Sequence, residues 1–544
     1  MKGLIFTFSV LFGLSTTIAQ TDRYVTEIFS DSDIEITNNL TYGSNVNYMP
    51  ASVGGNDIGD IVAAVGAILG GADLDTLLNF IDLKMDIYQP NQTVDTVSER
   101  PVILYVHTGN FLPPPANGGP TGSKDDLMAV ELCTQMAKRG YVAIAANYRH
   151  GWNPLLPNEE DRTKGLLNAV YRAIHDIKQA VRFTKSEATT YHIDKEKIAL
   201  FGMGSGGYVA LAYSTLDEAE ELYLDKFVGT DTVPFIDTIL SGPISGIGGL
   251  LNAYTANGES DEIHACINTG GALADTSWLA QGDVPMIAFQ TIRDPFAPFE
   301  DGIVKVPTTN GSVVEAFGAN TFIDMANAYG NNDVFRNLNI SDSYTTAAES
   351  RYGMSYQYFL PAPNDSIQVN EDMDGMFPFL LPLAGSRFEN QGSPWDWWDP
   401  NSTIAQTVVA VIGGNDITAH MAASASNPDM SETKCKTYLD TIQNYLQPRL
   451  VLSLGLPNNI GLDEYEIAGL EAFPNPVQDN LNIRSEETIS EVHIYDISGK
   501  MIKKLLSVDK NYLIVPRNNI ENGIYFVKII ANNGHSSTLK ISWK

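Results

Sequence analysis

Short apolar runs separated by stretches of helical periodicity dominate the first part of the chain. Runs rich in β-branched and aromatic residues predict strands, and apolar residues that recur every three or four positions predict helices. The predicted strands cover residues 80–88, 101–106, 141–146, 198–201 and 284–289, and the predicted helices cover residues 124–138, 162–187 and 431–446. Because strands that alternate with helices form mostly parallel sheets covered on both faces, the pattern predicts an α/β fold.

A long segment between residues 300 and 400 lacks this alternation. It is rich in Asn, Asp, Pro and aromatic residues, and it places Trp395, Trp397 and Trp398 close together. An excursion of this length between core strands predicts an inserted cap rather than a bare loop. The apolar run at residues 403–412 is then predicted to be the last core strand.

The pattern changes again near the C-terminus, where short strands alternate with turn residues. Residues 472–544 contain nine Lys or Arg and seven Asp or Glu, a balance of +2, whereas the whole chain carries −31. The change in pattern and charge predicts a separate small β-sandwich, joined to the first domain by a linker at residues 456–471.

The N-terminus has the features of a secretory signal peptide. Lys2 precedes an apolar stretch at residues 3–14, and small residues lead to a predicted cut after Ala19. No later apolar segment approaches the length of a transmembrane helix. The sequence therefore predicts an exported protein without a transmembrane anchor.

Charge and cysteine content exclude several classes of function. With 34 Lys or Arg against 65 Asp or Glu, the chain would be repelled by nucleic acid and by anionic membranes. Three cysteines, Cys133, Cys266 and Cys435, allow at most one disulfide and lack metal-site spacing. We therefore expect buried free thiols, and no metal or cofactor.

Residues 197–214 carry the main chemical signal. An apolar run at residues 198–201 is followed by Gly202, Gly204 and Gly206, by the hydroxyl of Ser205, and then by apolar residues at helical spacing. This order predicts a strand, a tight turn and a helix.

Residues from about 80 to 446 resemble the secreted carboxylesterase and lipase branch of the α/β-hydrolases. The turn at residues 202–206 is similar to the G-x-S-x-G nucleophile elbow, and residues 107–111 (HTGNF) are similar to the H-G-G-G-F loop. The resemblance implies oxyanion contacts at Gly109 and Asn110 and an elbow that includes Gly204 and Gly206. Asp294, followed by Pro298, is similar to the D-x-x-V-P segment that carries the catalytic acid.

The resemblance leaves two hypotheses for the chemistry. In the family the chain order is Ser, Asp, His, and His420 is the only histidine between Asp294 and the C-terminal domain, which implies catalysis by Ser205, Asp294 and His420. Read without a gap, however, G-x-S-x-G places Gly204 in the nucleophile position and leaves Ser205 to cap the helix. The first hypothesis is a serine carboxylic-ester hydrolase acting on a small-molecule or polymer-borne ester. The alternative is an inactive, ligand-binding hydrolase fold.

Residues 472–477 (AFPNPV), 494–500 (IYDISGK) and 522–528 (NGIYFVK) resemble, in order, three signatures of the C-terminal sorting domain of the bacterial type IX secretion system. The resemblance implies export through the periplasm and across the outer membrane, with the secretion machinery as a partner. The mature protein would then be secreted or held at the cell surface.

Overall fold

The structure is a computed structural model of the full chain. It describes residues 23–306, 309–336, 342–358, 365–381, 391–457, 467, 469–496, 501–506, 508–518, 520–532 and 536–544. The predicted signal peptide, most of the predicted linker and residues 497–500 of the second tail signature lie outside the described residues. The chain divides into two compact units, one ending at residue 458 and one beginning at residue 459.

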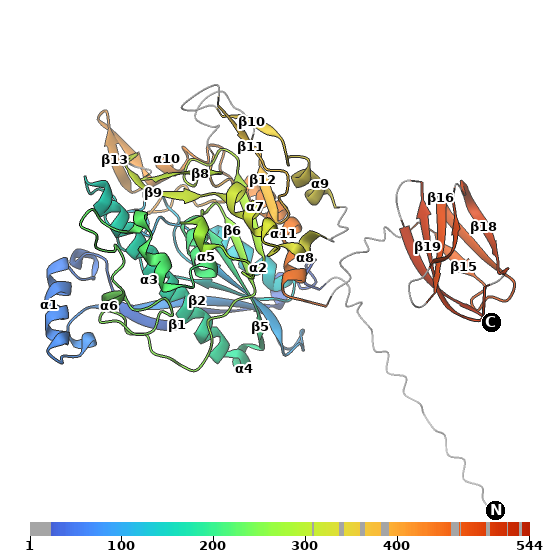
Figure 1. The fold of residues 1–544 in the computed structure, drawn as a ribbon, viewed down its shortest axis with the longest axis horizontal. Coiled ribbons are helices and arrows are strands. Elements are labelled where there is room, and N and C mark those ends of the chain that lie inside the picture. Colours follow the sequence, from blue (N-terminus) through green and yellow to red (C-terminus); the bar gives the residue numbers. More distant parts are fainter. Residues whose placement is uncertain are drawn as a thin grey trace, which may run out of the picture. The chain divides into compact units, whose positions relative to one another are not determined.

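An eight-stranded sheet forms the centre of the first unit (Figure 1). In sheet order its strands are β1 (Ile34–Val46), β2 (Phe80–Pro90), β4 (Val142–Ala146), β3 (Arg100–Val106), β5 (Ile193–Met203), β6 (Ala265–Thr269), β7 (Met286–Thr291) and β12 (Met376–Phe379). β1 and β2 join the sheet in antiparallel register, and the other strands run parallel. This arrangement confirms the predicted mostly parallel sheet.

Helices cover both faces of this sheet, since every residue of β3, β4, β6 and β7 is buried. The longer helices are α1 (Ile58–Leu69), α2 (Leu127–Lys138), α3 (Glu159–Ser186), α5 (Ser205–Thr215), α7 (Ala319–Ala328) and α11 (Glu432–Ser453). The shorter ones are α4 (Ala188–Tyr191), α6 (Thr238–Ser241), α8 (Asp333–Arg336), α9 (Ser343–Glu349) and α10 (Ala419–Ala423).

The last strand of the sheet differs from the prediction. β12 lies inside the segment predicted as a cap, and it pairs parallel with β7 at one edge of the sheet. The predicted last strand at residues 403–412 supplies β13 (Val408–Ile412) instead, which pairs with β14 (Asn415–Thr418) in an exposed antiparallel hairpin. The prediction was therefore wrong on this strand, and the insertion consists of one excursion before β12 and a second after it.

Both excursions contribute elements on the same side of the sheet, where Figure 1 shows β8, β9, β13 and α10 gathered. The first contains the hairpins β8 (Asp301–Lys305) with β9 (Ser312–Phe317) and β10 (Ser355–Tyr358) with β11 (Asp365–Gln368). Arg162 of α3 donates to the carbonyl of Ser312 at 2.9 Å, so the β8–β9 hairpin is held against the first domain's longest helix.

The second unit is a single antiparallel sheet with its own core. Its strands are β15 (Glu471–Phe473), β16 (Asn480–Asp496), β17 (Met501–Leu505), β18 (Lys510–Pro516), β19 (Gly523–Ala531) and β20 (Ser536–Trp543). The long strand β16 pairs with β15, β17, β18 and β19, which curls the sheet around buried residues such as Val492, Val527 and Trp543. The predicted small β-domain is confirmed.

No helix among the described residues is long and apolar enough to cross a lipid bilayer. All three cysteines are buried free thiols, as their number predicts. Burial raises the pKa of the Cys133 and Cys266 thiols, so both stay protonated at neutral pH.

Candidate functional site

The turn between β5 and α5 has the form of a nucleophile elbow, and Gly204 is its apex. β5 ends at Met203 and α5 begins at Ser205, while Gly204 between them has φ 53° and ψ −118°. A residue with a side chain is strained in this conformation, which makes glycine the residue that tolerates it best. A Cβ on Gly202 or Gly206 would overlap a backbone carbonyl oxygen, so these two glycines are the close-packed neighbours of the apex.

Ser205 therefore follows the apex, and its hydroxyl points into protein rather than to a base. Its Oγ accepts from the N–H of Asn110 at 3.1 Å and lies 3.0 Å from the hydroxyl of Tyr148. That phenol donates its only proton to the carbonyl of His107 at 3.0 Å, so Ser205 must donate to Tyr148. Burial raises the pKa of Tyr148, so the phenol stays protonated and cannot act as a base that removes the proton of Ser205.

The contacts of Ser205 replace the helix cap that the alternative hypothesis expected. α5 has no side-chain cap at its start. Instead, Ser205 ties the helix to the loop at residues 107–111, in which Gly109, Asn110 and Phe111 all have positive φ. The hydroxyl of Ser205 accepts the hydrogen bond of the Asn110 N–H. Asn110 is one of the two residues that the resemblance assigns to oxyanion binding, so its N–H already has a partner.

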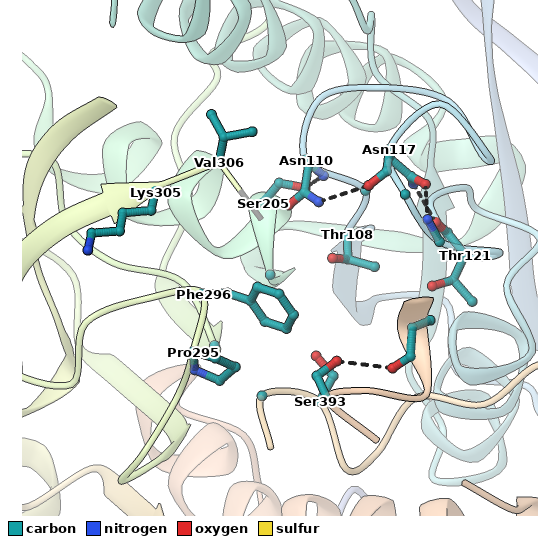
Figure 2. A pocket seen from close by; sticks show the side chains of 18 of the residues that line it. Thr108, Asn110, Asn117, Thr121, Ser205, Pro295, Phe296, Lys305, Val306 and Ser393 are labelled. Atoms are coloured by element: carbon teal, nitrogen blue, oxygen red, sulfur yellow. Dashed lines mark hydrogen bonds between the residues drawn. The ribbon is translucent and has the colours of Figure 1, made fainter. Parts of the chain in front are cut away.

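Thr108 fills the space that an apex side chain would need. A Cβ on Gly204 would overlap Oγ1 of Thr108 and lie 3.0 Å from its Cβ. Figure 2 shows Thr108 below Ser205 in this part of the cavity. Thr108 replaces the first glycine of the H-G-G-G-F pattern, and Gly204 stands at the serine position of the G-x-S-x-G pattern read without a gap. These departures from two different patterns therefore lie next to each other in space.

His420 is held in the tautomer opposite to that of a general base. The indole Nε1 of Trp398 donates to its Nδ1 at 3.1 Å, and the hydroxyl of Ser424 lies 3.4 Å from the same nitrogen. Because an indole N–H can only donate, Nδ1 carries no proton and the ring proton is on Nε2. A triad histidine needs the reverse arrangement, with Nδ1–H on the acid and a free lone pair on Nε2.

Asp294 follows β7 in a loop and is only 8% exposed. Its Oδ1 accepts from the N–H groups of Phe296 at 2.8 Å and Ala297 at 3.2 Å. Burial raises the pKa of Asp294 to about 7, and these two hydrogen bonds oppose the shift. The carboxylate makes no hydrogen bond to His420, so within the described residues the predicted acid and base are not paired.

A cavity of about 1070 Å³ brings the predicted site residues together. Ser205, Asp294, His420, Gly109, Asn110 and Gly204 all line it, whereas Gly206 is packed behind the turn. Much of the remaining wall is apolar and comes from α3, α5 and the β8–β9 hairpin. Among the described residues, no group of three or more His, Cys, Asp or Glu could hold a metal ion.

Two segments of the chain match known families. Residues 85–237 match the BD-FAE family, and residues 471–544 match the secretion system C-terminal sorting domain. The chain contains an α/β-hydrolase-type domain and a sorting domain. The match to the hydrolase-type domain includes the loop at residues 107–111 and the elbow, and it ends before Asp294 and His420.

Solved structures similar to the hydrolase-type domain include those of esterase 2 from Thermogutta terrifontis. The form phosphorylated by paraoxon is 21% identical, with 40% of this chain and 69% of that chain covered and a TM-score of 0.26. The propionate-bound form is 20% identical, with 40% and 70% covered and a TM-score of 0.26. No curated protein matches the sequence.

Sequence reasoning missed three residues that shape the hydrolase-type site. Thr108 stands at the first glycine of the H-G-G-G-F pattern, and its position in that loop is the signal that it faces the elbow. Tyr148 is the second residue after β4, and residues at the carboxyl ends of parallel strands meet at the same edge of the sheet. Trp398 belongs to the tryptophan group, but no local pattern connects it with His420.

The tautomer of His420 is directly testable by nitrogen NMR. At alkaline pH we expect Nδ1 of His420 to show the shift of an unprotonated nitrogen and Nε2 that of an N–H. Trp398→Phe removes the shorter of the two hydrogen bonds at Nδ1 and should give a mixture of tautomers. Trp397→Phe, which alters a neighbouring buried indole, should leave the wild-type spectrum. A protonated Nδ1 in the wild-type protein would contradict the assignment.

Proposed function

We propose that this chain is an exported protein whose hydrolase-type domain binds a small molecule non-covalently in the cavity beside Gly204. The conformation of Gly204 carries the proposal, because it puts a residue without a side chain at the apex of the elbow. A serine hydrolase needs a hydroxyl at this point, within reach of a histidine base. Gly204 supplies no hydroxyl, and Nδ1 of His420 accepts from Trp398 instead of donating to Asp294, which supports the proposal.

The neighbouring contacts support the same function. Ser205 donates to Tyr148, a phenol that stays protonated, and Thr108 occupies the space of the missing side chain. The Trp398 N–H leaves the ring proton of His420 on Nε2, where a general base needs a lone pair. The contacts of Ser205 with Asn110 and Tyr148 would have to break before Ser205 reacted with an ester, whereas a non-covalent ligand requires neither to change.

Carboxylic-ester hydrolysis through Ser205 is the second candidate. The match of residues 85–237 to the BD-FAE family and the positive φ values in the loop at residues 109–111 favour it. On this hypothesis a substrate would displace Asn110 from Ser205, and Asp294 and His420 would move together. The two candidates give opposite results with a reagent that reacts with active serines.

Fluorophosphonate labelling of the folded full-length protein tests the proposal. We expect no labelling and no hydrolysis of short-chain esters, and no change in Ser205→Ala, because the wild-type serine lacks a base. A serine esterase labelled in parallel is the positive control, and the unfolding midpoint confirms that the sample is native. Labelling of the wild-type protein that disappears in Ser205→Ala would overturn the proposal and establish the second candidate.

We further propose that the sorting domain takes the protein across the outer membrane by the type IX route after entry into the periplasm. The match at residues 471–544 supports this route, and the secretion machinery is then the protein's partner during export. The ligand cavity would consequently face the medium or the cell surface.

A further inference from the structure

The cavity beside Gly204 contains polar atoms that have no partner in the protein. The hydroxyl of Tyr208 is buried and makes no hydrogen bond. Oδ2 of Asp294 and Oγ1 of Thr108 also have no hydrogen-bond partner among the described residues. The N–H of Ser205 is at the first position of α5, where no acceptor within the helix exists. A buried polar group without a partner is costly, so the Tyr208 hydroxyl indicates a polar group supplied by a ligand, and the other three groups face the same cavity.

These atoms lie around one point of the cavity. The N–H of Gly204 donates to the carbonyl of Thr269 at 2.8 Å, and the next residue, Gly270, has its Cβ position 3.6 Å from Oδ2 of Asp294. Tyr208 lies one turn along α5 from Gly204, and the charge of Asp294, together with the larger effect of burial, raises the pKa of Tyr208. Thr108 faces Gly204 directly.

On one side of this point the cavity is an apolar chamber. Residues of α3 and of the β8–β9 hairpin line it, including Leu166, Leu167, Val170, Val304, Val313 and Val314. Figure 2 shows Val306 on this side of Thr108, and the polar side chains of Asn117 and Thr121 on the other. A ligand that extends from the apolar chamber to this point is therefore apolar at one end and polar at the other.

We propose that the cavity binds a monocarboxylic acid with an apolar chain, placing the carboxyl group at Thr108, Ser205 N–H, Tyr208 and Asp294 and the chain in the apolar chamber. The inference rests on the proposed function, because a reactive serine would hydrolyse an ester at the place where the carboxyl group binds.

A carboxylate suits the donors at this point better than an uncharged group does. The hydroxyls of Thr108 and Tyr208 and the N–H of Ser205 can all donate, and a carboxylate accepts through two oxygens. The start of α5 adds the positive end of an eleven-residue helix. Asp294 also faces the ligand here, and in its protonated form it donates as well.

Asp294 makes binding depend on pH. Its carboxyl group accepts from the N–H groups of Phe296 and Ala297 in its own loop, and it lies near the backbone of Gly270 and Gly392. The titratable groups near it are Tyr208 on α5 and, in the wall of the same cavity, His420 and Asp396. Its pKa of about 7 means that the carboxyl is neutral below pH 7 and charged above it. A ligand anion must bind beside the neutral form, so the affinity should fall as pH rises through 7.

Calorimetric titration of the full-length protein with decanoate, methyl decanoate and decanol tests this inference. We expect decanoate to bind at about pH 6 at least tenfold more tightly than either uncharged analogue, and to lose about tenfold in affinity by about pH 8. Asp294→Asn should remove most of the pH dependence. Methyl decanoate that binds as tightly as decanoate, or decanoate affinity that does not change with pH, would overturn the inference.

Side-chain variants locate the bound carboxyl group. Tyr208→Phe removes one unpaired hydroxyl and should weaken decanoate binding about tenfold, because a charge-assisted hydrogen bond is lost. Ser214→Ala removes a hydroxyl from the same helix that bonds to the carbonyl of Ala210, and it should leave the affinity unchanged. Hydrolysis of methyl decanoate would refute the proposed function itself. An inert protein that fails to bind decanoate would refute only the carboxylate ligand.

Discussion

Gly204→Ser is expected to lower the free energy of unfolding by about 4 kcal/mol, about half from backbone strain and half from overlap with Thr108. Gly204 has φ 53° and ψ −118°, a conformation unfavourable for serine. Rotation of Thr108 about χ1 cannot remove the overlap, because its Cβ is itself 3.0 Å from the new Cβ. Thr108→Gly combined with Gly204→Ser should therefore recover about 2 kcal/mol.

The measurement is urea unfolding of the four proteins that make a double-mutant cycle, followed by tryptophan fluorescence. Gly248→Ser is the matched control, because Gly248 has φ 87° but no atom within 4 Å of its Cβ position. It should cost about 2 kcal/mol from backbone strain, and Thr108→Gly should not rescue it. Equal rescue of both serine variants, or rescue of neither, would show that Thr108 does not fill the apex position.

The same double variant tests whether a hydroxyl at the apex of the elbow is sufficient for catalysis. With Thr108→Gly and Gly204→Ser, a hydroxyl stands at the apex of the elbow, yet His420 still offers an N–H because Trp398 donates to its Nδ1. Under the proposed function, the absence of catalysis at this site is therefore spread over residues from three separate segments of the chain. One substitution at Gly204 would not reverse it, since removal of any one triad member costs several powers of ten in rate.

The sequence allowed the core of the fold to be predicted because its signals are local. Apolar runs of strand length alternate with helical spacing, and the glycine group after residue 201 marks the turn between β5 and α5. The last strand was missed because residues 376–379 sit in an aromatic-rich segment and include Pro378, which a strand tolerates only at an edge. The apolar run of β13 was assigned to the core, although Gly413 and Gly414 after it are a hairpin signal.

The site was predictable only in part, because its decisive contacts join distant segments. The pattern located Gly204, Ser205, Asp294 and His420, and the structure places all four on one cavity. The orientation of Ser205 depends on its contacts with Tyr148 and Asn110. The spacing of residues 197–214 does not predict a contact with either residue. The displaced serine therefore leaves two hypotheses open, and the backbone angles of Gly204 support the proposed one.

Deletion of residues 472–544 is expected to reduce the extracellular protein at least tenfold in a bacterium with the type IX machinery. The sorting domain has its own hydrophobic core and forms a compact unit separate from the hydrolase-type domain. Its removal should therefore leave the first unit folded but without the surface that the machinery recognises.

Immunoblots of medium, periplasm and cells measure the effect, and we expect the truncated protein to accumulate in the periplasm. The purified truncated protein is the control for folding: its unfolding midpoint and its decanoate titration should match those of the hydrolase-type domain in the full chain. Because the core of the sorting domain is independent, a loss of export accompanied by an unchanged unfolding midpoint assigns the defect to recognition rather than to instability. Equal amounts of truncated and full-length protein in the medium would show that residues 472–544 are not needed for export.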